Sequence, residues 1–141
     1  MKRIAILNGP NLDRLGRRQP EIYGTATLQD LARLLRAEAK LLGLSLTFFQ
    51  SNHEGTLIDK LGALADRKFD GIIINPGGLA HTSIVLRDAL AGTGVRTIEV
   101  HLTDITKREK FRRMSLTAGA CEAMIGGQGF AGYVEALRRF G

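Results

Sequence analysis

Glu99 and His101 stand two residues apart in the apolar run IEVHL, a spacing that points both side chains to the same face of a β-strand. A carboxylate beside an imidazole fixes the orientation of the ring and favours its protonated form. This is the arrangement of a general acid that works near neutral pH. A strand-end histidine that merely satisfies a buried glutamate would show the same spacing, so the pair alone leaves both interpretations open.

A long polar segment, residues 8–24, follows the first apolar run and contains Arg17, Arg18 and Tyr23. Loops between a strand and a helix usually have about 2–6 residues, so a longer one is typical of a lid or a binding loop. A tyrosine hydroxyl has an ordinary pKa of about 10, but a neighbouring guanidinium favours the phenolate, which is a usable base. Packing of the Tyr23 ring on the first helix is an equally simple explanation.

Polar segments also follow the next three apolar runs: QSNHEG, NPGGLAHTS and HLT, which together contain all three histidines, His53, His81 and His101. The glycines of NPGGLAHTS permit close backbone approach, and HTS offers hydroxyls and N–H groups at a helix start, which suits an anion or a simple N-cap. The histidines lack the helical spacing of zinc motifs, and no nucleophile elbow occurs. We therefore expect no metal site and no serine-hydrolase chemistry.

Alternating strand-like and helix-like segments must position these side chains. The strands are expected at residues 4–8, 46–50, 71–75, 96–101 and 123–125. Amphipathic helices are expected at 27–43, where Thr27 caps the start and Gly43 ends the helix, and at 55–68, 81–92 and 129–140, with a short helix near 107–113. The glycine pattern of residues 127–132 indicates a turn before the last helix, because too little chain follows for a dinucleotide-binding unit.

This alternation predicts a parallel sheet covered on both faces. Five strands in 141 residues favour a flavodoxin-like, doubly wound α/β fold that forms a single domain over residues 1–141. Ligands of such folds bind at the carboxyl ends of the strands, which is where the polar segments fall.

Composition narrows the class of protein further. A hydrophobic content of 44% with 24% charged residues is ordinary for a globular protein, and no apolar run reaches the ~20 residues of a membrane helix. One cysteine, Cys121, excludes an internal disulfide and favours a cytoplasmic protein in which this residue packs in the core. The net charge of +6 is densest at residues 107–113, but without a nucleic-acid motif it favours a solvated basic surface or attraction of a small anion over a nucleic-acid partner.

Seven blocks of the chain occur in a fixed order between residues 4 and 137: NGPNL, PEIYG, QSNHEG, DGIIINPG, HTS with LRDAL, IEVHL and REKFRRMS. Together they closely resemble the type II 3-dehydroquinate dehydratases, or type II dehydroquinases. The resemblance implies a lyase, a hydro-lyase that converts 3-dehydroquinate to 3-dehydroshikimate without metal or cofactor. It also implies a dodecamer built from trimers that serves shikimate-pathway aromatic amino acid biosynthesis or quinate metabolism. The alternative is a catalytically silent relative that acts as a binding or assembly module.

The same resemblance implies a role for each site residue. Tyr23 removes the proton next to the ketone, and Arg18 rather than Arg17 activates it. His101, paired with Glu99, protonates the departing hydroxyl, while Asn11 helps to stabilise the enolate through an ordered water. Substrate contacts are expected from Asn75, His81, the backbone at Leu102 and Thr103, Arg112 and, from a neighbouring subunit, Asp88.

The departures from the family pattern are local. Thr103 and Asp104 replace the usual Ser-Asn, Met114 stands where a histidine is common, and Leu116–Ala118 replaces a tyrosine followed by leucine and serine. Asp104 adds a negative charge near a site for an anion. These positions concern substrate affinity and trimer contacts, whereas the catalytic set is complete.

Overall fold

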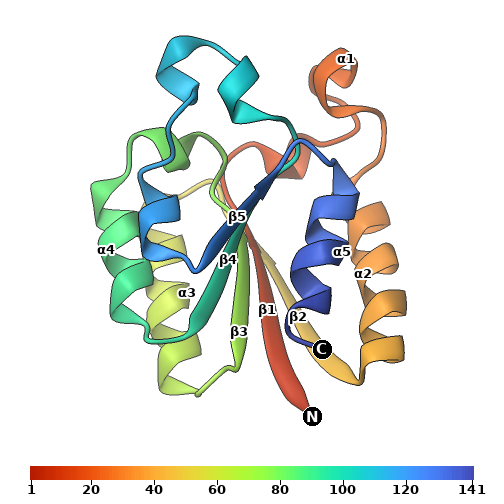
Figure 1. Cartoon of the computed structure of the whole chain (residues 1–141), viewed down its shortest axis with the longest axis vertical. Helices are drawn as coiled ribbons and strands as arrows, with labels where there is room; N and C mark the ends of the chain where they lie inside the picture. Colours follow the sequence, from red (N-terminus) through yellow and green to blue (C-terminus); the bar gives the residue numbers. More distant parts are fainter.

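Five parallel strands form one sheet at the centre of the molecule (Figure 1). The structure, a computed structural model, describes the chain of 141 residues except for the side chain of Tyr23. The strands are β1 (Lys2–Asn8), β2 (Leu44–Gln50), β3 (Gly71–Asn75), β4 (Arg96–His101) and β5 (Ala123–Gly126). Their order, β2-β1-β3-β4-β5, confirms the flavodoxin-like arrangement predicted from the sequence.

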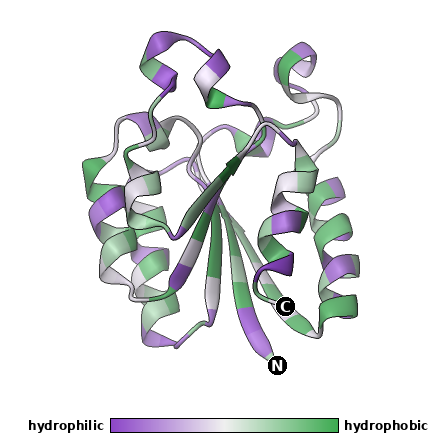
Figure 2. Ribbon diagram, viewed as in Figure 1, coloured by the Kyte–Doolittle hydropathy of each residue, from purple (hydrophilic) through white to green (hydrophobic). Residues whose placement is uncertain are grey.

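Two layers of helices cover the sheet. α2 (Leu28–Leu42) and α5 (Phe130–Arg138) lie on one face, and α3 (Glu54–Asp66) and α4 (Ile84–Gly92) lie on the other (Figure 1). Strand β1 serves both layers, since Ile4 and Ile6 pack toward α2 and α5, whereas Ala5 and Leu7 pack toward α3 and α4. Figure 2 shows the resulting pattern, with apolar strands between the helices and polar segments gathered at the end of the sheet where the chain leaves β4.

Local sequence explains where α2 begins and ends. Thr27 and Asp30 form a capping box at the N-terminus, and Gly43 ends the helix in the left-handed conformation at φ 70°. Leu31, Leu35 and Ala39 bury one stripe against the sheet. The predicted caps are therefore confirmed, and so is the turn before α5, which begins at Phe130 directly after Gly129.

Two helix predictions were wrong in detail. The helix expected from residue 81 begins only at Ile84, because residues Gly77–His81 form a separate 3-10 turn, η2, and Ser83 caps α4 through a bond from the N–H of Leu86. The helix expected near 107–113 is instead two 3-10 turns, η3 (Ile105–Lys107) and η4 (Lys110–Arg112), separated by an extended Arg108. Only Ile105 is buried within these turns, so the repulsion among their cations is not offset by a buried stripe.

The remaining elements lie above the carboxyl edge of the sheet or beside it. They are η1 (Leu12–Arg14), the one-turn helix α1 (Pro20–Tyr23) and η5 (Thr117–Ala120). No helix in the part of the chain that the structure describes is long and apolar enough to span a bilayer.

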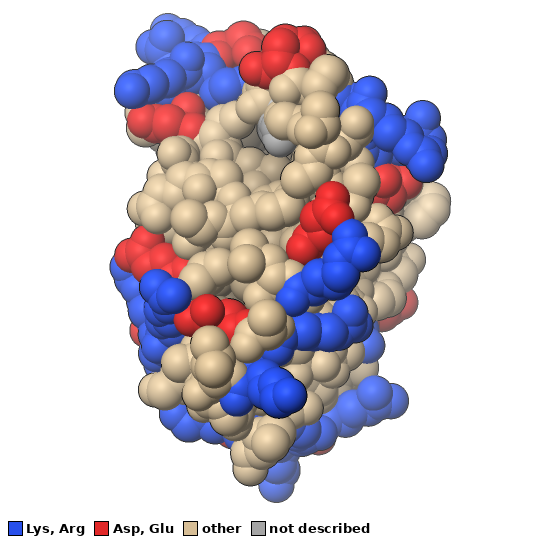
Figure 3. Space-filling view, turned by 90° about the vertical axis from the view of Figure 1, so that its right-hand side faces the viewer, with Lys and Arg blue, Asp and Glu red and all other residues tan. Residues whose placement is uncertain are grey.

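Basic side chains are spread over the outer helices rather than gathered in one stripe. On the side that carries α2 and α5, arginines and lysines alternate with carboxylates (Figure 3). Three of these arginines are paired: Arg33 with Asp30, Arg138 with Glu38 and Arg139 with Glu135. Such exposed pairs each contribute little to stability, but they divide the positive surface into small patches.

Candidate active site

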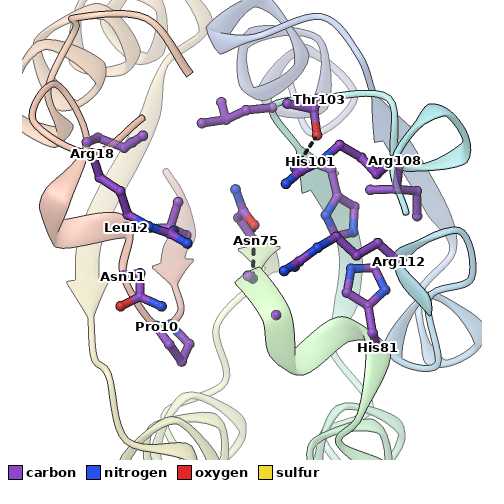
Figure 4. Close-up of a pocket in the computed structure, with 15 residues that line it drawn as sticks. Pro10, Asn11, Leu12, Arg18, Asn75, His81, His101, Thr103, Arg108 and Arg112 are labelled. Carbon is purple, nitrogen blue, oxygen red and sulfur yellow. Dashed lines mark hydrogen bonds between the residues drawn. The ribbon is translucent and has the colours of Figure 1, made fainter. Parts of the chain in front are cut away.

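A cavity of about 220 Å³ opens at the carboxyl ends of β1, β3 and β4 (Figure 4). This is the edge of the sheet at which the sequence placed the ligand site. Its lining is rich in nitrogen-bearing side chains: Asn11, Arg18, Asn75, His81, His101, Arg108 and Arg112. Leu102 and Thr103 also line it. The cavity thus offers cations and hydrogen-bond donors from segments far apart in the chain.

The wall at the end of β4 carries the predicted carboxylate–imidazole pair. His101 Nε2 lies 2.7 Å from Glu99 Oε2, and the exposed fraction is 5% for His101 and 0% for Glu99. Because the carboxylate engages Nε2, Nδ1 is the ring nitrogen left to exchange a proton with a ligand. The spacing of two residues on a strand therefore produced the same-face geometry that the sequence predicted.

Two hydroxyl groups complete the surroundings of the Glu99 carboxylate. Ser115 Oγ donates to Oε2 at 2.5 Å, and Thr117 Oγ1 donates to Oε1. With the bond to His101, three donors from the described part of the chain surround this buried anion. A fully buried carboxylate is stable only when such partners replace the lost water.

His81 faces His101 across one side of the cavity, with ring centroids 6.3 Å apart and ring planes inclined by 27°. Its Nδ1 lies 2.8 Å from the carbonyl oxygen of Met114, and because a carbonyl only accepts, this nitrogen carries the proton. In the neutral ring Nε2 is then an acceptor. The two imidazoles therefore play different roles at the cavity: His101 can exchange a proton through Nδ1, whereas His81 can accept a hydrogen bond at Nε2.

The floor of the cavity is held by a buried polar cluster at the ends of β1 and β3. Asn75 Oδ1 accepts from the N–H of Gly77 at 3.1 Å, which fixes the orientation of the amide. Tyr133, reaching from α5, donates from its hydroxyl to Asn8 Oδ1 at 2.5 Å and is also hydrogen-bonded to Asn75. Burial raises the pKa of Tyr133, so this hydroxyl stays protonated and acts as a structural donor.

The opposite wall is built from the loop after β1. Asn11 adopts a left-handed backbone at φ 70°, and its N–H donates to Asn52 Oδ1 at 2.9 Å. Gly9 lets this loop approach the loop after β3, because a Cβ there would lie 2.5 Å from the carbonyl oxygen of Pro76. Arg18 lines the cavity and Arg17 does not.

Not every predicted site residue lies at this cavity. The side chain of Tyr23, the expected base, is outside the described residues. Asp88 is exposed on α4 and does not line the cavity, so within one chain it is apart from the other site residues. His53 is also exposed and away from the lining, although it follows β2 as the pattern suggested.

Asp104, which was expected to bring a negative charge close to the site, stands between two residues that line the cavity, Thr103 and Ile105, and also has a local role. Its carboxylate accepts from the N–H of Thr106 at 3.0 Å and from its hydroxyl at 2.5 Å, and thereby caps η3. These bonds, with a smaller contribution from Lys107, hold the pKa of Asp104 below its usual range. Asp104 does not line the cavity.

Among the contributors that sequence reasoning missed are Arg108, which lines the cavity, and Ser115 and Thr117, which bind Glu99. Arg108 was treated as one member of a charged run, although it belongs to the REKFRRMS block. Ser115 and Thr117 carry no periodic signal. The one clue was chemical, since a glutamate expected inside a sheet requires donors from elsewhere in the chain. In the part of the chain that the structure describes, no three His, Cys, Asp or Glu residues form a metal-binding group.

Comparison with known proteins places this geometry in a family. The model of the family described as dehydroquinase class II matches residues 2–141. A 3-dehydroquinate dehydratase of Herminiimonas arsenicoxydans is 50% identical over 136 residues, covering 96% of this chain and 94% of the relative. One of Bacillus licheniformis is 50% identical over 140 residues, covering 99% and 96%.

The solved structures agree with the sequence relatives. The crystal structure of a type II dehydroquinase from Butyrivibrio crossotus has a TM-score of 0.96 and 39% sequence identity, with 99% of this chain and 97% of that one covered. Fold, strand order and nearly full-length sequence similarity all point the same way. The chain therefore belongs to the class II dehydroquinase family.

Proposed function

We propose that this protein is a 3-dehydroquinate dehydratase, a hydro-lyase that converts 3-dehydroquinate to 3-dehydroshikimate through an enolate. The names of its relatives supply the substrate, and family membership over nearly the whole chain supports the transfer. The observation that carries the proposal is the buried Glu99–His101 pair at the wall of a cavity lined by Arg18, Arg108 and Arg112. An imidazole held this way suits a proton donor, and the cations suit a substrate that bears a carboxylate.

In the proposed reaction Tyr23, as its phenolate, takes the proton next to the ketone, and the electron pair moves onto the carbonyl oxygen to give an enolate. Arg18 favours the phenolate and stabilises negative charge, and Asn11 stabilises the enolate through a water. Collapse of the enolate expels the hydroxyl group, to which protonated His101 gives its Nδ1 proton, so that water leaves. The next turnover requires that the proton gained by Tyr23 returns to His101 or to solvent.

Substrate contacts follow from the same cavity. Asn75, His81, Arg112 and the backbone at Leu102 and Thr103 are the proposed binding groups, and each of these residues lines the cavity. Glu109 holds the Arg112 guanidinium through a 2.7 Å contact, which orients a cation at the mouth. No metal or cofactor takes part in this scheme, because a phenolate, a guanidinium and an imidazolium supply the required charges.

The assembly that we propose is a dodecamer of trimers, in which Asp88 reaches the site of a neighbouring subunit. Asp88 lies on α4 beside Ile84 and Val85, whose exposed fractions of 63% and 52% are high for apolar side chains. A contact through this face would cover them. The proposed setting is cytoplasmic, in shikimate-pathway biosynthesis of aromatic amino acids or in quinate metabolism, with no nucleic-acid or membrane partner.

The direct test is an ultraviolet assay of the purified protein on 3-dehydroquinate, which follows formation of the conjugated enone. We expect turnover by the unmodified protein and loss of turnover with ligand binding retained in Tyr23→Phe. Absence of turnover in the unmodified protein would favour the alternative, a silent relative that acts as a binding or assembly module.

A further inference from the structure

We infer that Thr117, with Ser115, is a positioning residue for catalysis: the two hydroxyls hold the Glu99 carboxylate, which in turn holds the His101 ring. The inference rests on the proposed function for its kinetic consequences, although the geometry itself does not. Neither hydroxyl belongs to a residue that lines the cavity, so any influence on the reaction passes through Glu99.

The carboxylate of Glu99 is divided among three donors in a defined way. Oε2 accepts from His101 Nε2 at 2.7 Å and from Ser115 Oγ at 2.5 Å, whereas Oε1, among the residues that the structure describes, accepts from Thr117 Oγ1 alone. The bond from Thr117 therefore restrains the rotation of the carboxylate about its last torsion angle, together with the two bonds to Oε2. With Oε1 fixed, Oε2 stays directed at the imidazole. Without the bond from Thr117, Oε1 of a carboxylate that is 0% exposed loses its donor. Because an unpaired buried oxygen is unfavourable, the carboxylate would rotate toward another donor.

The backbone around these hydroxyls is itself anchored. The N–H of Leu116 donates to the carbonyl oxygen of Ala80 at 2.7 Å, and Arg87 donates to the carbonyl oxygen of Leu116 at 3.1 Å. Ser115 Oγ also accepts from the N–H of Ala118 at 3.1 Å. Because the segment is tied to η2 and α4, Thr117 meets Glu99 from a fixed position rather than from a free loop.

The same short segment also orients the second imidazole. The carbonyl oxygen of Met114 accepts a hydrogen bond from His81 Nδ1, and Ser115 and Thr117 act on His101 through Glu99. Residues 114–117 thus fix the proton positions of two rings whose centroids are 6.3 Å apart. Preorganised second-layer contacts of this kind fix ring orientation in other histidine sites.

The experiment compares Thr117→Val, Thr117→Ser and the matched control Thr97→Val. Thr97 lies on the same face of β4, two residues before Glu99, is 2% exposed and donates to the carbonyl oxygen of Val95 at 3.0 Å. Three quantities are measured for each variant: kcat and KM on 3-dehydroquinate, and the proton NMR signal of the His101 ring N–H that is bonded to Glu99.

We expect Thr117→Val to lower kcat about tenfold, a part of the ~10²–10⁴-fold that a general acid supplies, with KM essentially unchanged. Its ring N–H signal should shift or broaden, whereas Thr117→Ser and Thr97→Val should keep the parental kcat and signal. Two results overturn the inference: parental kcat and signal in Thr117→Val, or an equal loss in Thr97→Val. The NMR signal does not depend on turnover, so it decides the inference even if the proposed function fails.

Discussion

The two walls of the cavity are built in opposite ways. The wall at the end of β4 is buried, since Glu99 and His101 are 0% and 5% exposed, and the Glu99 carboxylate and His101 Nε2 are engaged by neighbours. The wall from the loop after β1 is exposed at Asn11 and Arg18, and it contains two non-glycine residues with positive φ, Asn11 at 70° and Gln19 at 44°.

This contrast separates two tasks that the reaction sets. A proton donor works best in a fixed position, so it is held by the sheet and by buried hydroxyls. Substrate must enter and product must leave, so the other wall is built from a solvent-exposed loop. As a hypothesis, the loop that carries Arg18 and Tyr23 closes over the substrate, and crystallographic order of residues 13–23 with and without ligand would test it.

The largest expected effect lies in the buried wall. Replacing His101 by Asn should lower kcat about 10³-fold, because the leaving hydroxyl would lose its proton donor. The exposed His53 provides the control, and His53→Asn should keep the parental rate. Equal losses in the two variants, measured by enone absorbance, would contradict the assignment of the acid to β4.

In the exposed wall, the shape of the cationic group at residue 18 should affect kcat. Arg18→Lys should lower kcat about 10²-fold, because a compact ammonium cannot reproduce the flat guanidinium. Arg17→Lys removes the same functional group one residue away, outside the cavity lining, and should leave kcat essentially unchanged. A larger loss in Arg17→Lys than in Arg18→Lys would reverse the choice between these arginines.

A change in the cavity floor should lower the free energy of unfolding. Tyr133→Phe leaves Asn8 Oδ1 buried without its donor, which should cost about 1–3 kcal/mol in the free energy of unfolding, measured by urea titration. In a double-mutant cycle with Asn8→Ala the two losses should be less than additive, since both remove one bond. Strict additivity would show that the bond contributes nothing.

The smallest effect concerns Cys121, next to the buried wall. Burial, and secondly the charge of Glu99, raise the pKa of its thiol to about 12 from 9.0. A group whose pKa is raised by folding contributes stability that is fully present below pH 9 and is lost as the pH rises toward 12. The unfolding free energy of the unmodified protein should therefore fall more steeply between pH 9 and 11 than that of Cys121→Ala. Parallel curves would contradict the shift.

Much of the fold was predictable because its signals are local. Runs such as GIIIN specify buried parallel strands, and the caps at Thr27 and Gly43 specify the ends of α2. The cluster at residues 107–113 was mispredicted because its charges were not weighed against the little apolar surface it buries.

The site was predictable to the extent that one strand or one motif carries it. Glu99 and His101 followed from a spacing of two, whereas the preference for Arg18 came from family resemblance. Ser115 and Thr117 escaped because their partner, Glu99, lies 16 and 18 residues away in the chain. Only the folded chain brings these hydroxyls to a carboxylate that is 0% exposed.

In the proposed reaction, the loop after β1 supplies the base and β4 supplies the acid. Proton exchange in D2O is the most direct test of this assignment. The variant His101→Asn lacks the acid but should still form the enolate. The enolate then takes up deuterium next to the ketone, so that 3-dehydroquinate becomes labelled while almost no enone appears. Tyr23→Phe, without the base, should show neither labelling nor enone. Labelling by Tyr23→Phe at the rate seen in His101→Asn would contradict a base on the N-terminal loop that acts opposite an acid on β4.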